Sequence, residues 1–300
     1  MDFKENAQWE RINMRISNIS EEEMKTFKRN EGLFIFATWS PVRFGVFYLK
    51  NILALMARNL SDDDLLLLDR ITNRSYGNPI TVRIKGRDIC QDYMQALDEA
   101  KFMLETSQSV ERIIEIGAGY GRTSHTLLSL NPNIEEYVII DLAECMSLSR
   151  HYLERVLPAE TFAKIRFVLN TDCKQYLEEA DKKMTLAVNC DSLGEMEREV
   201  SASYLTLIEK HAGYFYSCNP VAKYDPACFE EGDFDASLAK DALEAGLLTA
   251  KINVFDDVAV EENIQPYLKA MKPDENWTIH NFSIAKMYTY YVHVLYGRDN

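Results

Sequence analysis

The pattern of hydrophobic positions divides the chain into a helical front part and a back part in which strands and helices alternate. Residues 1–107 carry helix start signals rather than strand alternation, among them the capping-box spacing of residues 20–23 and the acids after Ser61. The segment 41–59 is apolar on more than one helical face. We therefore expect it to pack on the main domain or on a second subunit, so a homodimer is one of the predictions.

From residue 108 onward, five apolar strand patterns alternate with helix patterns: "RIIEI", "EYVIID", "KIRFVLN", "MTLAVNC" and "AGYFYSCN". Strands joined by crossover helices predict a mainly parallel, doubly wound sheet. The tail "NWTIHNFSIAKMYTYYVHVLYGR" holds two strand patterns with a short gap, which predicts a closing hairpin and one antiparallel strand. The predicted fold class is α/β, with a mostly parallel seven-stranded sheet and a helical N-terminal extension.

Two irregular stretches suggest how the chain is organised. The stretch "NRSYGNPITVRIKGRDI" breaks the helical pattern with Gly and Pro and alternates like a short hairpin. We take it as the hinge between an N-terminal cap or oligomerisation region, residues 1–107, and a main domain, residues 108–300. Within the main domain, residues 223–270 form a long acidic connection, which is typical of a lid or substrate loop.

Composition narrows the class of protein. A hydrophobic content of 47% is ordinary for a globular chain. Six cysteines without a C-x-x-C pair, and no H-E-x-x-H motif, predict neither a disulfide framework nor a required metal. A net charge of -14 disfavours nucleic acid and anionic membranes and favours a small-molecule substrate. The chain shows no apolar run of about 18 residues and no signal-peptide pattern, which predicts a cytoplasmic protein.

The candidate chemistry begins where the first of these strands runs into Gly117, Gly119 and Gly121. A turn this rich in glycine lets a ligand approach bare peptide groups, so we expect a nucleotide-like cofactor at the carboxyl end of the strand. A phosphate-binding NTPase loop needs G-K-[ST], but Arg122 follows the last glycine. Arg122 also occupies the third-glycine slot of the dinucleotide fingerprint, which weakens an NAD-dependent oxidoreductase reading.

Acidic residues around the turn favour a positively charged cofactor, S-adenosyl-L-methionine. Glu115, just before the glycines, has no task beside a pyrophosphate, whereas it suits an ammonium or sulfonium group. Asp141, at the end of "YVIID", has the spacing from Gly119 of an acid that binds a ribose diol, or it caps the next helix. Asp172 is the analogous candidate for the adenine amino group, with helix capping as the alternative.

The motif Glu115-x-Gly117-x-Gly119-x-Gly121 resembles the first motif of class I S-adenosylmethionine-dependent methyltransferases. More narrowly, "VIIDLAECMSLSRHYL", "NCDSLGEM" and "GYFYSCNP" resemble the bacterial sugar O-methyltransferase family. This resemblance implies a Rossmann-like fold and O-methylation of a sugar or sugar-like molecule, linked to a nucleotide or glycan. The implied cofactor-binding residues are Glu115, Gly117, Gly119, Gly121, Asp141, Leu142, Asp172 and Asn189.

Methylation of an alcohol needs a general base, and "NCDSLGEM" offers Asp191 and Glu195. We expect one of them to be the base or a ligand of the substrate hydroxyl. The alternative is that Ser192 caps a helix and Glu195 closes the capping box. His280 is a further candidate base if it points into the cleft. A non-catalytic cofactor-binding protein also remains open, with an intact turn and no base.

Overall fold

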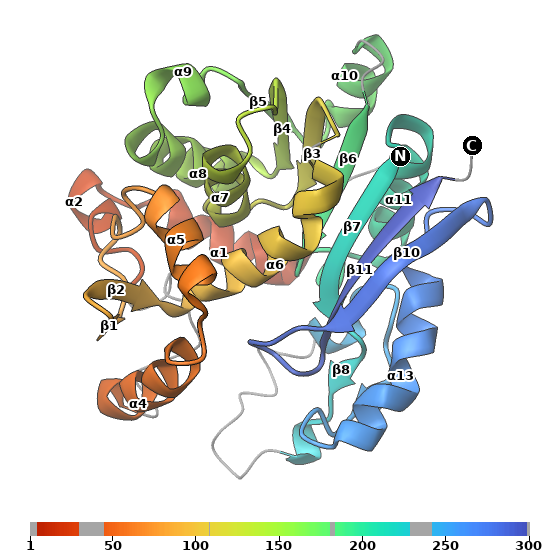
Figure 1. The fold of residues 1–300 in the computed structure, drawn as a ribbon. Coiled ribbons are helices and arrows are strands. Elements are labelled where there is room, and N and C mark those ends of the chain that lie inside the picture. Colours follow the sequence, from red (N-terminus) through yellow and green to blue (C-terminus); the bar gives the residue numbers. More distant parts are fainter. Residues whose placement is uncertain (1–4, 30–44, 108, 181–183, 229–241, 299–300) are drawn as a thin grey trace.

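The computed structural model describes residues 5–29, 45–107, 109–180, 184–228 and 242–298 (Figure 1). Its centre is a seven-stranded sheet in the order β10-β11-β7-β6-β3-β4-β5. The strands are Arg112–Ile116 (β3), Glu136–Asp141 (β4), Ile165–Leu169 (β5), Thr185–Cys190 (β6), Tyr214–Pro220 (β7), Trp277–Ile284 (β10) and Tyr291–Arg298 (β11).

The direction of the strands confirms the predicted fold class. The strands β3 to β7 pair in parallel, while β11 lies between β7 and β10 and is antiparallel to both. The tail therefore forms the closing hairpin that the sequence predicts. Numbered from β3, the order is 3-2-1-4-5-7-6, that of a Rossmann-like methyltransferase sheet.

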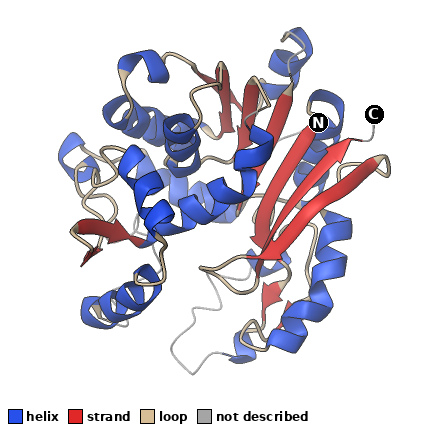
Figure 2. Cartoon of the chain, viewed as in Figure 1, coloured by secondary structure: helices blue, strands red, loops and turns tan. Residues whose placement is uncertain are grey.

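Helices cover both faces of the sheet (Figure 2). One face carries α6 (Gln91–Ser107), α7 (Arg122–Leu130) and α8 (Ala143–Val156), and the short α9 (Ala159–Phe162) follows α8. The other face carries α10 (Cys173–Glu179), α11 (Arg198–His211) and α13 (Asp257–Ala270). Because successive strand side chains point to opposite faces, Ile113 joins one core and Ile114 the other.

The carboxyl edge of the sheet brings the candidate residues together. The strand β3 lies between β4 and β6, and the chain leaves β3 for β4 on one side and reaches β6 on the other. Such a reversal opens a crevice at the carboxyl ends of the strands. The glycine turn after β3, Asp141 at the end of β4 and the loop after β6 all lie at this crevice.

The helical front part begins with α1 (Ala7–Ile16), α2 (Glu21–Met24), α4 (Val46–Ala57) and α5 (Asp62–Arg70). The predicted start signals are confirmed, because Ser20 with Glu23 and Ser61 with Asp64 form capping boxes. The predicted hairpin is present as β1 (Thr81–Ile84) and β2 (Arg87–Cys90), which pair antiparallel. The helix α1 packs on α8 of the main domain. The division at residue 107 stays a prediction.

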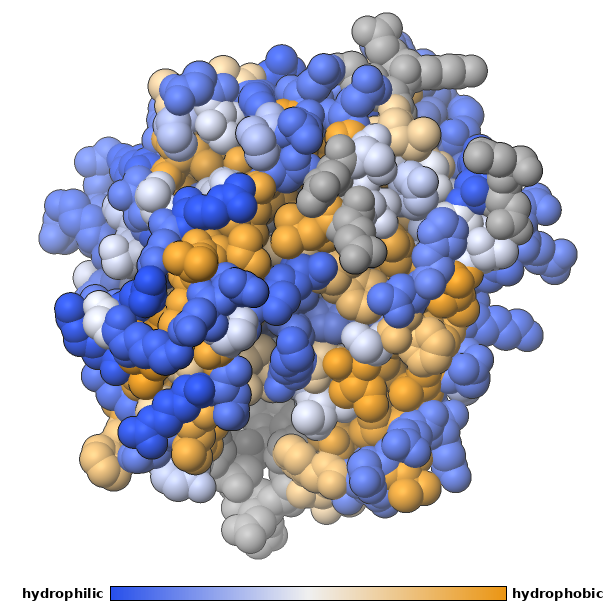
Figure 3. Space-filling view, viewed as in Figure 1, coloured by the Kyte–Doolittle hydropathy of each residue, from blue (hydrophilic) through white to orange (hydrophobic). Residues whose placement is uncertain are grey.

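The helix α4 exposes much of its apolar surface. It begins at Val46, so the first residues of the predicted helix 41–59 lie outside the described residues. Phe47 is 83% exposed, while Leu53 is buried. On the face in Figure 3, hydrophobic side chains form patches among hydrophilic ones. An exposed apolar helix is compatible with a partner subunit. The homodimer stays a prediction.

The connection 223–270 is described in part. It contains β8 (Lys223–Tyr224), the 3-10 helix η2 (Pro226–Cys228), β9 (Lys251–Ile252) and α13, and β8 pairs parallel with β9. The helix α13 contributes Tyr267 and Leu268 to the core of one sheet face. This part of the connection therefore supports the fold, and the lid remains a prediction. In the described ranges, no helix has the length and apolar character needed to cross a membrane.

Candidate active site

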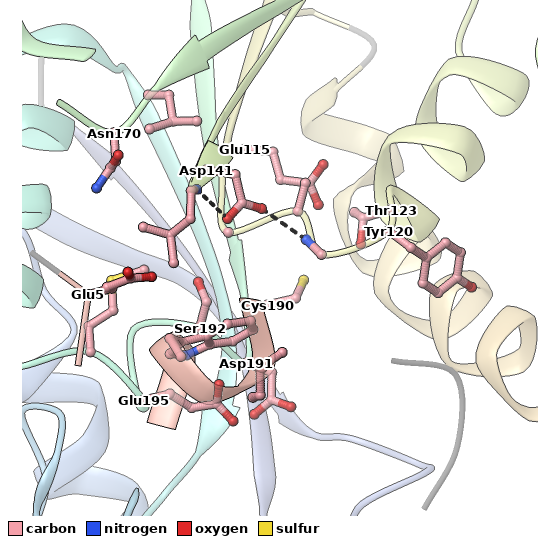
Figure 4. A pocket seen from close by; sticks show the side chains of 18 of the residues that line it. Glu5, Glu115, Tyr120, Thr123, Asp141, Asn170, Cys190, Asp191, Ser192 and Glu195 are labelled. Carbon is pink, nitrogen blue, oxygen red and sulfur yellow. Dashed lines mark hydrogen bonds between the residues drawn. The ribbon is translucent and has the colours of Figure 1, made fainter. Parts of the chain in front are cut away.

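A cavity of about 360 Å³ opens at the carboxyl edge of the sheet. The glycine turn, the end of β4 and the loop after β6 line it, and α1 of the front part closes one side (Figure 4). Of the predicted site residues, it brings together Glu115, Gly117, Gly119, Asp141, Leu142, Asp191 and Glu195. Residues that the sequence separates by up to 80 positions thus share one cavity.

The glycine turn has the backbone conformation that only glycine adopts readily. Gly117 and Gly119 have φ of +72° and +57°. A Cβ on Gly117 would lie 2.2 Å from the Ser192 Oγ, so the turn also leaves no room for a side chain. The close approach of Ser192 explains why a glycine is required at this position.

Asp141 holds the turn from the neighbouring strand. Its carboxylate accepts hydrogen bonds from the backbone N–H groups of Gly119 at 3.1 Å and Leu142 at 2.8 Å. Burial raises the pKa of Asp141 to about 7, and these two N–H groups limit the rise. Asp141 is 8% exposed and lines the cavity. The carboxylate can therefore accept donors from a ligand as well as from the turn.

Glu115 lies deeper, at the base of the turn. One carboxylate oxygen accepts hydrogen bonds from the Ser124 hydroxyl at 2.6 Å and the Tyr137 hydroxyl at 2.9 Å. Burial raises the pKa of Glu115, although both hydroxyl groups oppose the rise. The residue thus ties the turn to α7 and β4, while it also lines the cavity.

Asp191 and Glu195 form a carboxylate pair at the far end of the cavity, below the turn in Figure 4. Burial raises the pKa of Glu195 to about 8, and the charge of Asp191 adds to the rise. Burial also raises the pKa of Asp191 to about 6, opposed by the Tyr291 hydroxyl, which donates to its Oδ1 at 2.7 Å. Near neutral pH one of the two carboxyl groups therefore holds a proton and the other is a base.

Two further side chains, Trp9 and Lys223, contact the loop after β6 near Glu195. The Trp9 indole donates a hydrogen bond to Glu195, which lowers the pKa of Glu195. The Lys223 ammonium donates to the Gly194 carbonyl at 2.6 Å, and its charge also lowers the pKa of Glu195. Glu195 thus lies between α1 and the beginning of the 223–270 connection.

The alternative reading of Ser192 and Glu195 as a capping box is wrong. The helix α11 begins at Arg198, after the N-cap residue Glu197. Ser192 instead donates to the Ile116 carbonyl at 2.9 Å, at the end of β3. Because Glu195 has no capping task, its carboxylate is available to the cavity.

Two predicted cofactor residues support the site from behind rather than lining the cavity. Asn189 is fully buried and donates to the Ile116 carbonyl at 2.9 Å, which joins β6 to the start of the turn. Gly121 is the N-cap of α7 with φ of +94°, and a Cβ there would lie 2.9 Å from Leu153 of α8. Neither residue lines the cavity, so their role in cofactor binding stays a prediction.

The third departure concerns Asp172. It is exposed, it stands at the N-cap position of α10 without a side-chain cap, and it does not line the cavity. Asn170 lines the cavity instead, because β5 ends at Leu169 and Asn170 is the first residue after it. Its backbone N–H donates to the Asp141 carbonyl at 3.1 Å, which places it next to the end of β4.

Sequence reasoning named neither Arg122 nor any residue of the front part as a site residue. Arg122 lines the cavity and donates to the buried Glu99 at 2.7 Å, and its Nε has no hydrogen-bond partner within the described residues. The signal for a place of Arg122 at the cavity was a long basic side chain in the third-glycine position of the dinucleotide fingerprint. Nothing local in the sequence signals the α1 side of the cavity, which consists of Glu5, Asn6, Gln8, Trp9 and Ile12.

The histidines do not supply a base at the cavity. His280 lies on the exposed face of β10, beside the Tyr214 ring, and does not point into the cavity. His125 is buried in α7, which lowers its pKa to about 3. Across the part of the chain that the structure describes, no group of three or more His, Cys, Asp or Glu could hold a metal ion.

Comparison with known proteins finds likeness in fold. No family model and no curated protein matches this chain. The mitomycin 7-O-methyltransferase MmcR is 11% identical, with a TM-score of 0.44 over 69% of this chain and 54% of that chain. An O-methyltransferase family protein from Burkholderia thailandensis is 13% identical, with a TM-score of 0.42 over 67% and 56%.

A third solved structure, the methyltransferase domain of bacterial-CtHen1-C, is 11% identical, with a TM-score of 0.47 over 69% of this chain and 100% of that domain. The chain spans little more than half the length of the first two structures. At these identities the likeness is one of fold alone.

Proposed function

We propose that this chain is an S-adenosylmethionine-dependent methyltransferase that methylates a hydroxyl group of a sugar-like small molecule. The observation that carries the proposal is the arrangement of carboxylates around one cavity. Asp141 lies at one end, beside the glycine turn, and the pair Asp191 and Glu195 lies at the other. This arrangement offers a cofactor site and a base within one enclosed space.

The cavity residues fit the proposed cofactor. Among the described residues, the lining contains the carboxyl groups of Glu5, Glu115, Asp141, Asp191 and Glu195 and one basic side chain, Arg122. Such a lining favours a ligand with a positive charge and disfavours a pyrophosphate. The Asp141 carboxylate suits a ribose diol, and the free Nε of Arg122 is a donor for a carboxylate. Asn170 takes the place of Asp172 as the candidate for the adenine amino group.

When bound, S-adenosylmethionine supplies an activated methyl group, so the protein has to orient the acceptor and remove its proton. Glu195 in its ionised form is the proposed base, and Asp191 is the second carboxyl group of the pair. The amide side chains of Gln8 and Gln95 also line the cavity, and the Gln8 Oε1 has no hydrogen-bond partner within the described residues, so it can accept from a hydroxyl group. These amides and the carboxylate pair suit the hydroxyl groups of a polyhydroxylated acceptor, which supports a sugar-like substrate.

Calorimetric titration with S-adenosylhomocysteine and, separately, with NAD tests the cofactor. We expect saturable binding of S-adenosylhomocysteine and none of NAD. Binding of NAD alone would overturn the proposal in favour of an oxidoreductase.

Mass spectrometry of sugar-like metabolites incubated with the protein and S-adenosylmethionine tests the acceptor. A methylated sugar fragment is the expected product. Binding of the cofactor without turnover of any acceptor in a broad panel would favour the non-catalytic alternative.

A further inference from the structure

Lys28 is a buried lysine outside the cavity, on the segment that follows α2. It is 0% exposed, and its ammonium lies 2.8 Å from the Oδ2 of Asp92, in the first turn of α6. The ammonium also lies 4.9, 4.6 and 5.1 Å from the ring centres of Tyr93, Tyr120 and Tyr152. Burying a cation is unfavourable unless charge and aromatic faces compensate it, and this cluster provides both.

The segment around Gly77 contacts Lys28 and its neighbour Phe27. The backbone N–H of Lys28 donates to the carbonyl of Gly77 at 3.1 Å. Gly77 has φ of +86°, and a Cβ there would lie 2.5 Å from the ring of Phe27. The stretch before the β1–β2 hairpin therefore admits residues 27 and 28 only because it carries a glycine at this point.

The same carboxylate oxygen reaches the glycine turn. Tyr120 stands between Gly119 and Gly121, and its hydroxyl donates to the Asp92 Oδ2 at 2.7 Å. In Figure 4 the Tyr120 ring points away from the carboxylates of the cavity. One oxygen of Asp92 thus joins the ammonium of the front segment to the side chain that anchors the turn.

We propose that Lys28 is a positioning residue for the cofactor, acting through Asp92 and Tyr120 on the backbone of the glycine turn. This inference rests on the proposed function. The positive charge keeps the Asp92 carboxylate ionised and fixed, and the carboxylate keeps the Tyr120 ring in its pocket. Without Lys28, the buried carboxylate loses its counter-charge, and the turn loses the anchor opposite its bond to Asp141. Docking of the segment around residues 27–28 is therefore a condition for a formed cofactor site.

A double-mutant cycle on cofactor affinity tests the coupling. S-adenosylhomocysteine is titrated calorimetrically into the full chain, into Lys28→Met, into Tyr120→Phe and into the double variant. We expect each single change to weaken binding about tenfold, as for one lost hydrogen bond. The double variant should bind no more weakly than the weaker single variant. Losses that simply multiply would overturn the proposal, because they would mean that the two residues act independently.

Amide hydrogen exchange of residues 117–121, measured without ligand, tests the role of Lys28 independently of cofactor binding. Lys28→Met should speed this exchange. The matched control is Met24→Ala, which removes a buried apolar side chain from α2 of the same segment. It should lower the melting temperature without changing the exchange of the turn. Equal exchange in both variants would reduce Lys28 to a stability residue. If the wild type binds no S-adenosylhomocysteine, the proposed function fails, while this arm still decides the role of Lys28.

A second variant covers the case in which Lys28→Met does not fold. Lys28→Met with Asp92→Asn removes both charges and keeps an acceptor for the Tyr120 hydroxyl. We expect it to restore slow exchange of the turn and cofactor binding within a few-fold of the wild type. A folded double variant with fast exchange and weak binding would contradict the proposed route through Asp92.

Discussion

The carboxylate of Asp141 accepts a hydrogen bond from the backbone N–H of Gly119 at 3.1 Å, so the acid after one strand fixes the turn after its neighbour. We expect Asp141→Ala to weaken S-adenosylhomocysteine binding by roughly 10- to 100-fold, the range for hydrogen bonds to a charged group. Calorimetric titration measures the change. Asp172→Ala is the matched control, because Asp172 is exposed and outside the cavity. If Asp172→Ala had the larger effect, the cavity would not be the cofactor site.

The carboxyl groups of the cavity make the stability of the ligand-free protein fall with rising pH. The folded-state pKa values of Asp141 and Glu195 are raised to about 7 and about 8. A raised pKa contributes stability that is complete below the unfolded-state pKa and is lost as the pH rises through the folded-state value. His125, with a lowered pKa, acts in the opposite direction, but its contribution is complete above about pH 6.5, its unfolded value.

The melting temperature should therefore decline between about pH 4, near the unfolded-state pKa of a carboxyl group, and about pH 8, with His125 opposing the decline below about pH 6.5. Asp141→Asn keeps an acceptor for Gly119 but cannot ionise, so its melting curve should decline less steeply over the same window. Each pH unit between the unfolded-state and the folded-state pKa of one such group lowers the unfolding free energy by about 1.4 kcal/mol. Parallel declines in wild type and variant would show that Asp141 does not titrate in this range.

The fold was predictable because its signals are repeated along the chain. The central parallel strands show continuous apolar runs, since helices cover both faces, and the tail shows two strand patterns with one short gap. The glycine turn and Asp141 were predictable because each stands directly at the end of a strand. Asn170 rather than Asp172 lines the cavity, because β5 ends at Leu169, which the sequence does not show.

The α1 side of the cavity was not predictable by local reasoning. The side-chain amide of Asn6 donates to the Glu195 carbonyl at 2.6 Å, across 189 positions of the chain. Such a contact leaves no periodicity or spacing to detect. The capping-box reading of Glu195 failed for a related reason, because the choice between a helix cap and a turn depends on Ser192 bonding to the distant Ile116 carbonyl.

Glu195→Gln should lower turnover of the acceptor by about 10²- to 10⁴-fold, the usual contribution of a general base. Cofactor affinity should change little, because the amide keeps the size of the side chain. In the wild type, turnover should rise with pH through the range of about 6 to 8, as the carboxylate pair loses its shared proton. Glu199→Gln, at an exposed position in the first turn of α11, is the control. Near-normal turnover of Glu195→Gln would leave Asp191 as the base.

Gly117→Ala should destabilise the protein and abolish cofactor binding. Two effects combine, since φ of +72° is strained for alanine and the new Cβ would meet the Ser192 Oγ at 2.2 Å. Gly86→Ala separates the backbone strain from the steric clash. Gly86 has φ of +79°, but a Cβ added there would have nothing within 4 Å. It should show only the strain, about 1 to 2 kcal/mol of unfolding free energy in a urea titration. Equal losses for the two variants would mean that Ser192 yields to the added methyl group.

Trp9→Phe should shift the pH dependence of turnover to higher pH. The indole N–H donates to the Glu195 carboxylate and lowers its pKa, so a phenyl ring at this position leaves the pKa of Glu195 higher. Turnover should fall most at neutral pH and recover as the pH rises, whereas a general disruption of α1 would lower it at every pH. Trp277→Phe is the control, since Trp277 is buried in β10 and its indole nitrogen has no hydrogen-bond partner in the described structure. An unshifted profile for Trp9→Phe, with normal turnover, would remove α1 from the control of the base.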